Sequence, residues 1–402
     1  MPNRPTARLR GSPIDLGLVL VLLIYVAGLV FVGLTPFSFS PANRVEPLGR
    51  GPGLQFDTTG IATSRGEIRD PEEFPDNSLS IHLRIEPDDE PRTGLGTIFS
   101  LADNDRLPRL IIAQWKTWLV VRVRDTDRAS RGYWELDAAG FRKGQTHFVT
   151  ITSGPSEGTA IYLDGVATGD TRRHSIIRNS EPFLGRLLLG CLGDGSAGWR
   201  GKISGLAIAN TVFNPEEIAA QYELVVDDNF SALTGTRALV ALYDFTSADF
   251  TSANPTNSRT GDKELLHTVA NQVANSSLGE IEIPKIFSPL RPAVFAIPNL
   301  QDMKADWFLK DLLRNIAGFL PLGFIACIIL LRNRSAHGYV ITIQIALLGA
   351  LLSLGIEAVQ IALPMRISSL SDLYLNVIGA WIGSVIGLGL RHTWLGKPRT
   401  AT

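Results

Sequence analysis

The chain has 402 residues, of which 45% are hydrophobic and 19% are charged, and its 38 basic and 39 acidic residues leave a net charge of −1. This balance excludes the basic surplus of a nucleic-acid-binding protein, and the two cysteines exclude a disulfide-stabilised scaffold. The mean hydropathy of +0.13 comes from concentrated apolar segments rather than from a uniformly apolar chain.

The first apolar segment follows a short basic tail. Residues 14–34 are long enough to cross a bilayer as a helix, which takes about 20 residues. The segment exceeds the apolar core of a signal peptide, about 7–15 residues, and no small-residue cleavage site follows it. We therefore predict a cytoplasmic tail at residues 1–13 and a retained transmembrane helix at residues 14–35.

A long polar interval comes next, and residues 41–226 are predicted as an extracytoplasmic β-sandwich. Short β-rich segments between turn signals are typical of that fold. Asp164-Gly165 predicts a hairpin turn, and Asn214 with Pro215 predicts the start of a short helix. The predicted strands are Ser78–Ile85, Gly96–Leu101, Arg109–Ala113, Trp118–Val123, His147–Ser153, Thr159–Leu163, Arg186–Leu189 and Gly201–Ala209.

Two acidic clusters in this interval are candidate sites. Residues 86–90 have the spacing of three carboxylates on one strand face, but Pro87 interrupts the strand, so an acidic hairpin is favoured over a hydrolase. The run Asp103-Asn104-Asp105 lacks a full calcium-ligand spacing, so Ca²⁺ on the sandwich has weak support, and no cofactor or metal site is predicted. Stacking on sugar rings and packing in the core both stay open for Trp115, Trp118, Tyr133 and Trp134.

From residue 227 the chain is rich in Ser, Asn, Thr and Pro, so residues 227–309 are predicted as an extracytoplasmic connector. Within the connector, Arg237–Phe245 is a candidate late strand at a sheet edge. Three further transmembrane helices are predicted at residues 310–331, 339–363 and 372–390, and a cytoplasmic tail at residues 391–402.

Charge placement predicts the topology of these four spans. Basic residues of both tails and of the loop after the second span fall on one side, which the positive-inside rule assigns to the cytoplasm. Lys310 and Arg314, at the start of the second span, count against this assignment. Both termini are therefore expected in the cytoplasm, with residues 36–309 outside it.

Polar residues gather at the predicted outer ends of the last three spans, where ionisable groups usually mark sites. These residues form three pairs, Asp311 with Asn315, Glu357 with Gln360, and Asp372 with Asn376. The two members of each pair lie three or four residues apart and so share a helix face. Gly379, Gly383 and Gly387 continue the face of the last pair and permit close helix packing. The predicted binding residues are Asp311, Asn315, Glu357, Gln360, Arg366, Asp372 and Asn376, with Glu357 and Asp372 as catalytic candidates.

The alternative interpretation is structural: these polar groups only hold the helices in register, and Asp311 caps a helix. Arg366 is expected to pair with Glu357 or Asp372 as a charge-assisted partner.

Two resemblances support this organisation. The segments Phe148–Thr152, Ala160–Gly165 and Trp199–Ile208 resemble the central and penultimate strands of LamG-like, concanavalin A-like domains, over roughly residues 51–224. This resemblance implies a jelly-roll sandwich that binds glycans or calcium or serves as a spacer.

A second set of motifs lies in residues 310–390, namely Asp311-x-x-x-Asn315, Ser353-x-x-x-Glu357-x-x-Gln360, Pro364-x-Arg366 and Asp372-x-x-x-Asn376-x-x-Gly379. These motifs resemble those of the VanZ family. The resemblance implies a multi-pass protein of the bacterial plasma (inner) membrane and cell envelope, and a link to teicoplanin resistance. A LamG-like insertion is a known arrangement in this family.

Three functions stay open at this point. The first is an envelope binding protein whose partners are membrane lipids and an envelope glycan or lipid-linked precursor. The second is a membrane enzyme in which Glu357 and Asp372 do acid–base work and Arg366 holds a phosphate or carboxylate. Transport ranks last, because the bundle is small and lacks a polar path to the inner face. The oligomeric state is open.

Overall fold

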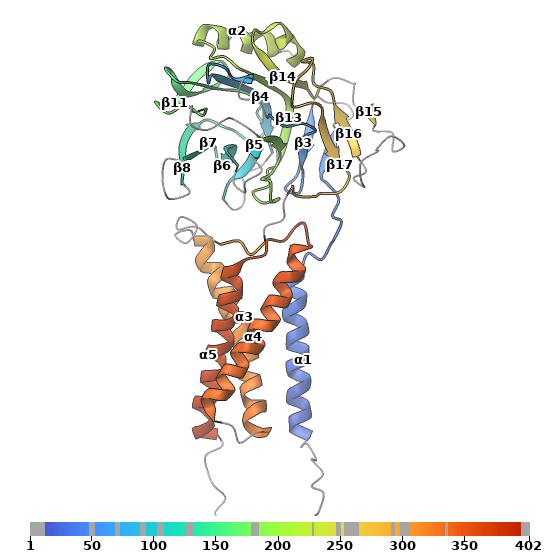
Figure 1. The fold of residues 1–402 in the computed structure, drawn as a ribbon, viewed down its shortest axis with the longest axis vertical. Coiled ribbons are helices and arrows are strands. Elements are labelled where there is room, and N and C mark those ends of the chain that lie inside the picture. The colour runs from blue at the N-terminus through green and yellow to red at the C-terminus, as the bar shows by residue number, and fades with distance from the viewer. Residues whose placement is uncertain are drawn as a thin grey trace, which may run out of the picture. The chain divides into compact units, whose positions relative to one another are not determined.

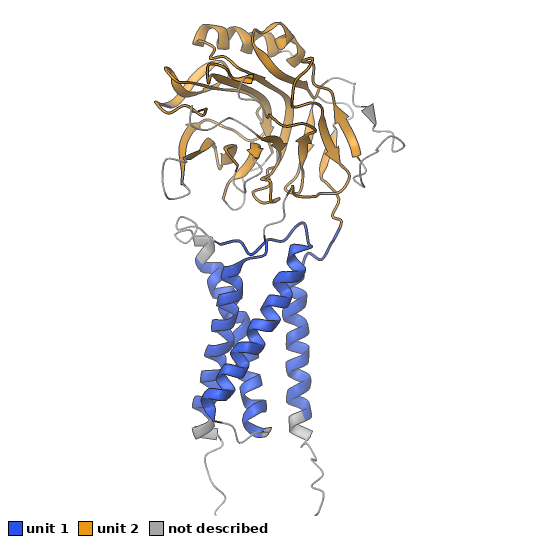
Figure 2. Cartoon of the chain, viewed as in Figure 1, with its two compact units in different colours: residues 1–39, 293–402 blue, residues 40–292 orange. Residues whose placement is uncertain are grey.

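The computed structural model describes residues 13–47, 53–68, 73–88, 94–102, 108–125, 132–177, 185–226, 229–246, 251–252, 265–290, 294–297, 306–333 and 337–394. The chain divides into two compact units, one made of residues 1–39 and 293–402 and the other of residues 40–292 (Figure 2).

Residues 40–292 form a sandwich of two antiparallel sheets (Figure 1). The first sheet has the strand order β1-β2-β13-β4-β9-β10-β11, with β14 also paired to β13. Its strands are β1 (Val45–Pro47), β2 (Leu54–Phe56), β4 (Leu79–Pro87), β9 (His147–Gly154), β10 (Gly158–Leu163), β11 (Val166–Arg172), β13 (Gly201–Ala209) and β14 (Leu239–Asp244).

The second sheet has the order β15-β16-β17-β3-β12-β5-β6-β7-β8. Its strands are β3 (Ala62–Ser64), β5 (Gly96–Ala102), β6 (Leu110–Trp115), β7 (Trp118–Asp125), β8 (Gly132–Ala139), β12 (Arg186–Leu189), β15 (Thr251–Ser252), β16 (Leu265–Val269) and β17 (Ile281–Pro284).

The core of the sandwich follows from the two-residue period of its strands. Alternate residues of β4, such as Ile81 and Leu83, join Phe99 of β5 and Val121 of β7 in one buried apolar cluster between the sheets. The opposite face of the first sheet is covered by α2 (Pro215–Val225) and the 3₁₀ helix η2 (Phe230–Gly235), which pack on Phe148. The predicted all-β sandwich and its eight predicted strands are confirmed.

Local signals placed the turns and the helix correctly. Asp164 and Gly165 both have positive φ, 52° and 80°, in the two-residue turn between β10 and β11. Asn214 caps α2 through a capping box with Glu217, and Pro215 is the first helical residue.

The structure differs from the expectation that residues 227–309 form a connector. The predicted strand near residue 240 exists as β14, and β15, β16 and β17 add three more strands, so the compact unit extends to residue 292. Tyr243 and Ile283 from this segment belong to the main core. The Ser-, Asn- and Pro-rich composition hid β16 and β17 because these strands are only five and four residues long.

The other unit contains four long helices, α1 (Pro13–Leu34), α3 (Asp306–Asn333), α4 (Gly338–Ile361) and α5 (Leu370–Trp394). Each is long and apolar enough to cross a membrane. Helices α3 and α5 approach closely along the predicted glycine face, where a Cβ at Gly379 or Gly383 would overlap the backbone carbonyl of Ile316 or Leu320.

Candidate functional site

The seven predicted residues, which we call the polar cluster, lie where α1 and α4 end and where α3 and α5 begin (Figure 1). The polar cluster consists of Asp311, Asn315, Glu357, Gln360, Arg366, Asp372 and Asn376. The helix directions place side chains from α3, α4 and α5 at one level, as the sequence predicts, although these residues are up to 65 positions apart along the chain (376 − 311).

Glu357 is the most deeply buried acid of the polar cluster, with 2% of its surface exposed. Its Oε2 accepts a hydrogen bond of 2.7 Å from the backbone N of Ser369, in the turn before α5. The same turn is held by Ala296, whose N donates to the Ser368 carbonyl and whose carbonyl accepts from the N of Leu370. Glu357 therefore fixes the entry to α5.

Gln360 and Arg366 bind the end of α1. Nε2 of Gln360 and Nη2 of Arg366 donate to the same carbonyl, that of Gly33, at 2.7 and 2.8 Å. The last carbonyls of a helix lack partners within the helix, so these two donors satisfy an otherwise open acceptor.

The expected ion pair of Arg366 is not found. Among the described residues, its guanidinium forms no ion pair within 4.0 Å of Glu357 or Asp372. The Gly33 carbonyl binds the group instead, because the end of α1 lies within its reach. Arg366 is nevertheless near enough for its charge to act on Glu357.

Asp311 and Asp372 bring two carboxylates together across the contact of α3 with α5. Asp372 lies beside Asp311 and Asn315, and Glu357 is close enough for its charge to act on both acids. Nδ2 of Asn315 donates to Oδ2 of Asp311 at 3.4 Å. Arg314 lies 4.0 Å from Asp311, but 77% of its side chain is exposed.

Asn376 forms a deeper layer with Ser353 of α4. Nδ2 of Asn376 donates to Oγ of Ser353 at 2.9 Å, and both residues are buried. Oδ1 of Asn376 and Oε1 of Gln360 are buried without a hydrogen-bond donor. The polar cluster therefore presents acceptors that its own donors do not satisfy.

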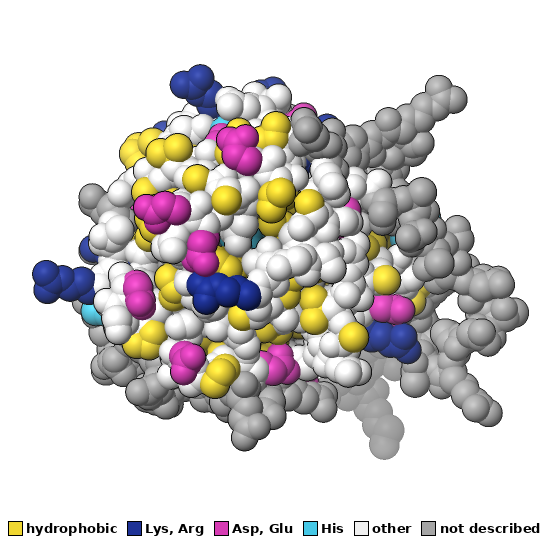
Figure 3. Space-filling model, turned by 90° about the horizontal axis from the view of Figure 1, so that it is seen from above, with side chains coloured by type: hydrophobic (Ala, Val, Ile, Leu, Met, Phe, Trp, Pro, Cys, Tyr) yellow, Lys and Arg dark blue, Asp and Glu magenta, His cyan; other side chains and the backbone are white. Residues whose placement is uncertain are grey.

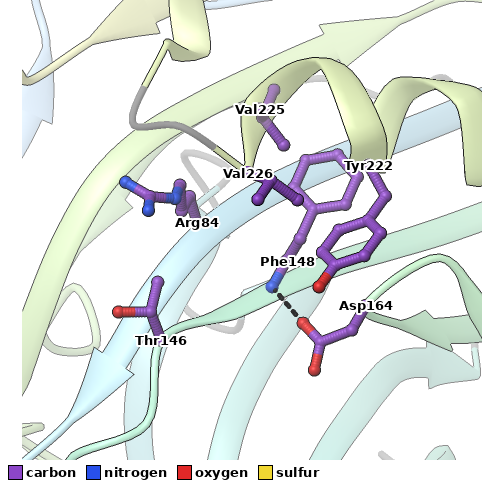
Figure 4. Close-up of a pocket in the computed structure, with 7 residues that line it drawn as sticks. All are labelled: Arg84, Thr146, Phe148, Asp164, Tyr222, Val225 and Val226. Carbon is purple, nitrogen blue, oxygen red and sulfur yellow. Dashed lines mark hydrogen bonds between the residues drawn. The ribbon is translucent and has the colours of Figure 1, made fainter.

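A second candidate site lies on the sandwich, in a pocket of about 120 Å³ between the first sheet and α2 (Figure 4). Asp164 is fixed there, since Oδ1 accepts from the N of Phe148 at 2.8 Å and Oδ2 lies 3.1 Å from Nδ1 of His147. Burial, with a smaller effect of the Asp164 carboxylate, raises the pKa of Tyr222. The sandwich pocket is lined by Arg84, Thr146, Phe148, Asp164, Tyr222, Val225 and Val226.

Sequence reasoning missed the sandwich pocket. The only available signal was the alternation of β4, which turns Arg84 away from the core that Leu83 and Ile85 enter. On the face of the molecule shown in Figure 3, apolar side chains are interspersed with acidic and basic ones rather than gathered in one patch.

The candidate acidic and aromatic residues of the sandwich contact other side chains of the fold, where the structure describes them. Glu86 pairs with Lys202 at 3.1 Å, and Asp88 accepts from Gln55. Trp134 packs against the core, whereas Trp115 and Trp118 face each other across a hairpin and are 45% and 37% exposed. Glu90 and the Asp103-Asn104-Asp105 run lie outside the described residues, and no group of three metal-ligating side chains occurs among those described.

The architecture defines a class: a membrane protein with a lectin-like β-sandwich placed in the sequence between its first and second long helices. Two family models match parts of the chain. VanZ/LLP1 matches residues 238–391, and a model of the concanavalin A-like lectin/glucanases superfamily matches residues 60–219. The chain is therefore a composite of a VanZ-like region and a laminin G-type, concanavalin A-like domain.

The VanZ/LLP1 match does not follow the division into units. It begins at residue 238, just before β14 of the sandwich, and it leaves out α1. No curated protein matches the chain.

Solved structures resemble the chain only distantly. A putative carbohydrate-binding protein from Bacteroides ovatus is 14% identical, with a TM-score of 0.39 over 58% of this chain and 58% of that one. A sialidase from Trypanosoma rangeli is 13% identical, with a TM-score of 0.35 over 45% of this chain and 28% of the sialidase. A pentraxin from Limulus polyphemus is 17% identical, with a TM-score of 0.29 over 45% of this chain and 78% of the pentraxin.

Proposed function

We propose that this chain is a bacterial cell-envelope protein with two binding parts. The sandwich binds an envelope glycan, and the polar cluster binds the headgroup of a membrane lipid or lipid-linked glycan precursor. The observation that carries this proposal is the pair of buried acceptors, Asn376 Oδ1 and Gln360 Oε1, that have no hydrogen-bond donor and lie on residues one helical turn from Asp372 and Glu357. Buried polar atoms normally have partners, so such a group points to a bound molecule.

The proposal places residues 36–309 outside the cytoplasm and both termini inside it. Support comes from the basic residues of both tails and of the loop between α3 and α4. Lys116, at the exposed tip of the β6–β7 hairpin, offers a labelling position. A Lys116→Cys variant should react with a membrane-impermeant maleimide in intact cells, and a Thr402→Cys variant only after lysis. The reverse pattern would contradict this topology.

The glycan-binding part is assigned to the sandwich pocket. Tyr222 and Phe148 supply aromatic surface there, and Arg84, Thr146 and Asp164 supply polar groups, a combination that suits a sugar ring and its hydroxyls (Figure 4). The full chain in nanodiscs should be retained by immobilised peptidoglycan or teichoic acid. Tyr222→Ala should lower that retention, whereas Leu224→Ala, an exposed residue of the same helix, should not. Failure of the wild-type chain to bind any envelope glycan would refute this part.

The second candidate function is a membrane enzyme, and the carboxylates of Glu357 and Asp372 favour it by their proximity. A Glu357→Gln variant keeps an oxygen that can accept from the N of Ser369 but cannot exchange a proton in the same way. If the chain is an enzyme, Glu357→Gln should abolish the cellular phenotype while the amount of protein in the membrane stays unchanged. If the polar cluster only binds, Glu357→Gln should reduce the phenotype in part. The matched control is Glu223→Gln, which lies on the exposed side of α2.

The link to teicoplanin belongs to the same proposal. Deletion of the coding sequence in its host should raise teicoplanin susceptibility, and expression of the wild-type chain should restore the original level. Unchanged susceptibility would refute a resistance role. The two binding proposals do not depend on that result.

A further inference from the structure

We propose that the tip of the β6–β7 hairpin docks on the lipid–water interface of the membrane. We call residues 115–118 the tryptophan tip, because Trp115 and Trp118 are the last cross-strand pair of this hairpin. Lys116 and Thr117 form the turn between them. Neither the sandwich pocket nor the polar cluster takes part in this docking.

The tryptophan tip exposes aromatic surface that the core of the sandwich does not use. Trp115 is 45% exposed and Trp118 is 37% exposed, whereas Ile112 and Val121, which face inwards from the same two strands, are 0% exposed. Neighbouring exposed apolar side chains commonly mark an interaction surface. An indole joins an apolar ring to one N–H donor, which suits the boundary between lipid headgroups and acyl chains.

Buried hydrogen bonds hold the tryptophan tip in place. Gln114 is 1% exposed, and its Nε2 donates to the carbonyl of Lys116 at 2.9 Å. Its Oε1 accepts from Nε1 of the buried Trp199 at 2.8 Å. From the other side, the N of Phe141 donates to the carbonyl of Thr117 at 3.1 Å. A turn fixed in this way loses little conformational entropy when it docks.

Basic residues accompany the two indoles. The ammonium of Lys116 lies 5.0 Å from the centroid of the Trp115 ring. Lys116 has a φ of 53°, so the turn holds a lysine where a glycine would fit with less strain. Arg142 and Lys143, both exposed, directly follow Phe141. These charges are complementary to lipid phosphates, and at headgroup level a lysine ammonium stays in water while the indoles contact lipid.

The tryptophan tip lies at the end of the sandwich where the chain enters and leaves it. The register places the ends of β6, β12 and β17 and the starts of β5 and β3 at one end of the second sheet. At the same end, Ala42 pairs with Ile286, and the carbonyl of Pro41 accepts from the N of Phe287. β17 and β6 are four inter-strand steps apart, which is about 19 Å at the usual spacing. The pairs that establish this register are Gln114–Gly96, Phe99–Leu189, Leu189–Ala62 and Glu282–Thr63.

A short connection joins this end of the sandwich to an apolar helix. Only residues 35–40 separate Leu34, the last residue of α1, from Pro41. Even in a fully extended chain these two residues are at most about 25 Å apart. The connection carries the exposed aromatic pair Phe37 and Phe39, whose ring centroids lie 5.0 Å apart. A membrane that holds α1 is therefore within reach of the tryptophan tip.

A neutral glycan fits the tryptophan tip less well than a lipid surface. A sugar ring would stack on the face of an indole, and the ammonium of Lys116 occupies one face of Trp115. The basic residues favour phosphate groups over uncharged hydroxyls.

A fluorescent label tests the docking in the full chain reconstituted in vesicles. Thr117→Cys places a dye in the tryptophan tip, and Ser156→Cys places it in the β9–β10 turn, at the opposite end of the sandwich from the chain entry at Val45. Both positions are exposed and both native cysteines are buried, so the unchanged chain measures background labelling. Lipids that carry a nitroxide on the headgroup should quench the dye at position 117 and not at position 156. Equal quenching at the two positions, or none at 117, would overturn the inference.

Lipid charge tests the basic residues. Quenching at position 117 should increase when phosphatidylglycerol replaces part of the phosphatidylcholine, because an anionic surface attracts lysine and arginine. No increase would overturn the part assigned to charge.

Variants in the Thr117→Cys chain locate the contact. Replacing both Trp115 and Trp118 by Ala should lower the ratio of docked to undocked chains about tenfold. Leu224→Ala, at an exposed position of α2, is the control and should leave quenching unchanged. Thermal midpoints should stay near that of the wild type, since both indoles lie at the surface. Unchanged quenching in a stable double variant would overturn the inference. Loss of retention on immobilised teichoic acid in that variant, without lipid quenching at position 117 in the parent chain, would identify an anionic glycan instead and overturn the lipid surface.

Discussion

At the scale of single residues, the carbonyl of Gly33 is the hydrogen-bond partner of two members of the polar cluster. Gln360 and Arg366 both donate to it, so these residues fasten α1 to the helices that follow the sandwich. Tyr25 adds a third link, because its hydroxyl donates to the Gly318 carbonyl at 2.7 Å. The structural interpretation of the polar cluster therefore applies to the donors of Gln360 and Arg366. It applies as well to Glu357, which accepts a hydrogen bond from the N of Ser369.

Arg366→Gln tests this fastening. The shorter side chain should not reach Gly33, and loss of a charged hydrogen bond should lower the free energy of unfolding by about 1–3 kcal/mol. Thermal unfolding in detergent measures the change. Arg314→Gln is the control, since 77% of that side chain is exposed, and its midpoint should stay near that of the wild type. Equal midpoints for both variants would contradict the role of Arg366.

His82 gives the sandwich a pH dependence. Complete burial lowers the pKa of His82 from 6.5 to about 3, while its Nδ1 lies 3.0 Å from Oγ1 of Thr150. Below pH 6.5 the unfolded chain takes up a proton that the folded chain does not, so this contribution to stability is lost as the pH falls from 6.5 towards 3. The limiting slope is about 1.4 kcal/mol per pH unit.

A pH series of sandwich unfolding should show this loss, and His82→Gln should flatten it. Burial also lowers the pKa of His267, so a shallower decline of the same sign should remain in the variant. An identical slope in wild type and His82→Gln would contradict the assignment.

At the scale of elements, the contact of α3 with α5 depends on glycines. A Cβ at Gly383 would overlap the Leu320 carbonyl, whereas a Cβ at Gly389, six residues along the same helix, would meet nothing within 4 Å. Close backbone approach therefore requires glycine at one position and not at the other.

Gly383→Ala should force the two helices apart and lower the thermal midpoint in detergent, with a cost of at least about 1–3 kcal/mol from overpacking. Gly389→Ala should be neutral or slightly stabilising, because alanine favours helix by about 1 kcal/mol over glycine. A Gly383→Ala protein as stable as Gly389→Ala would show that α3 and α5 do not pack along this face.

At the scale of the whole chain, the segment after residue 226 completes the sandwich. β14 pairs with β13 and β17 pairs with β3, so the segment adds one strand to the first sheet and three strands, β15, β16 and β17, to the second. Phe245 and Ile281, which come from this segment, are 0% exposed in the main core. Removing the segment exposes the apolar surface that these residues cover.

A fragment of residues 40–292 should therefore fold, and a fragment of residues 40–226 should aggregate or be degraded. Limited proteolysis and analytical gel filtration of the two fragments measure the difference. Equal protease resistance would show that β14 to β17 are dispensable and would restore the connector interpretation of residues 227–309.

The four helices, the eight sandwich strands and the capped helix α2 were all predictable from local patterns. Charge-free apolar runs mark the long helices, alternation marks strands such as β4, and Asn214 with Pro215 marks α2. These signals depend on residues close in sequence, so they are readable without the fold. Short strands such as β16 and β17 escaped because too few residues alternate to outweigh their polar surroundings.

The same division holds for the polar cluster. The predicted topology places Asp311, Glu357 and Asp372 at one level, since it follows from the apolar runs and the basic residues visible in the chain. The partner of each group depends on segments that meet only after folding. Gln360 and Gly33 are 327 residues apart, and no pattern in the sequence indicates that they touch. The tertiary structure alone assigns Arg366 to α1 rather than to an acid, because a hydrogen bond depends on distance and direction in space and not on separation along the chain.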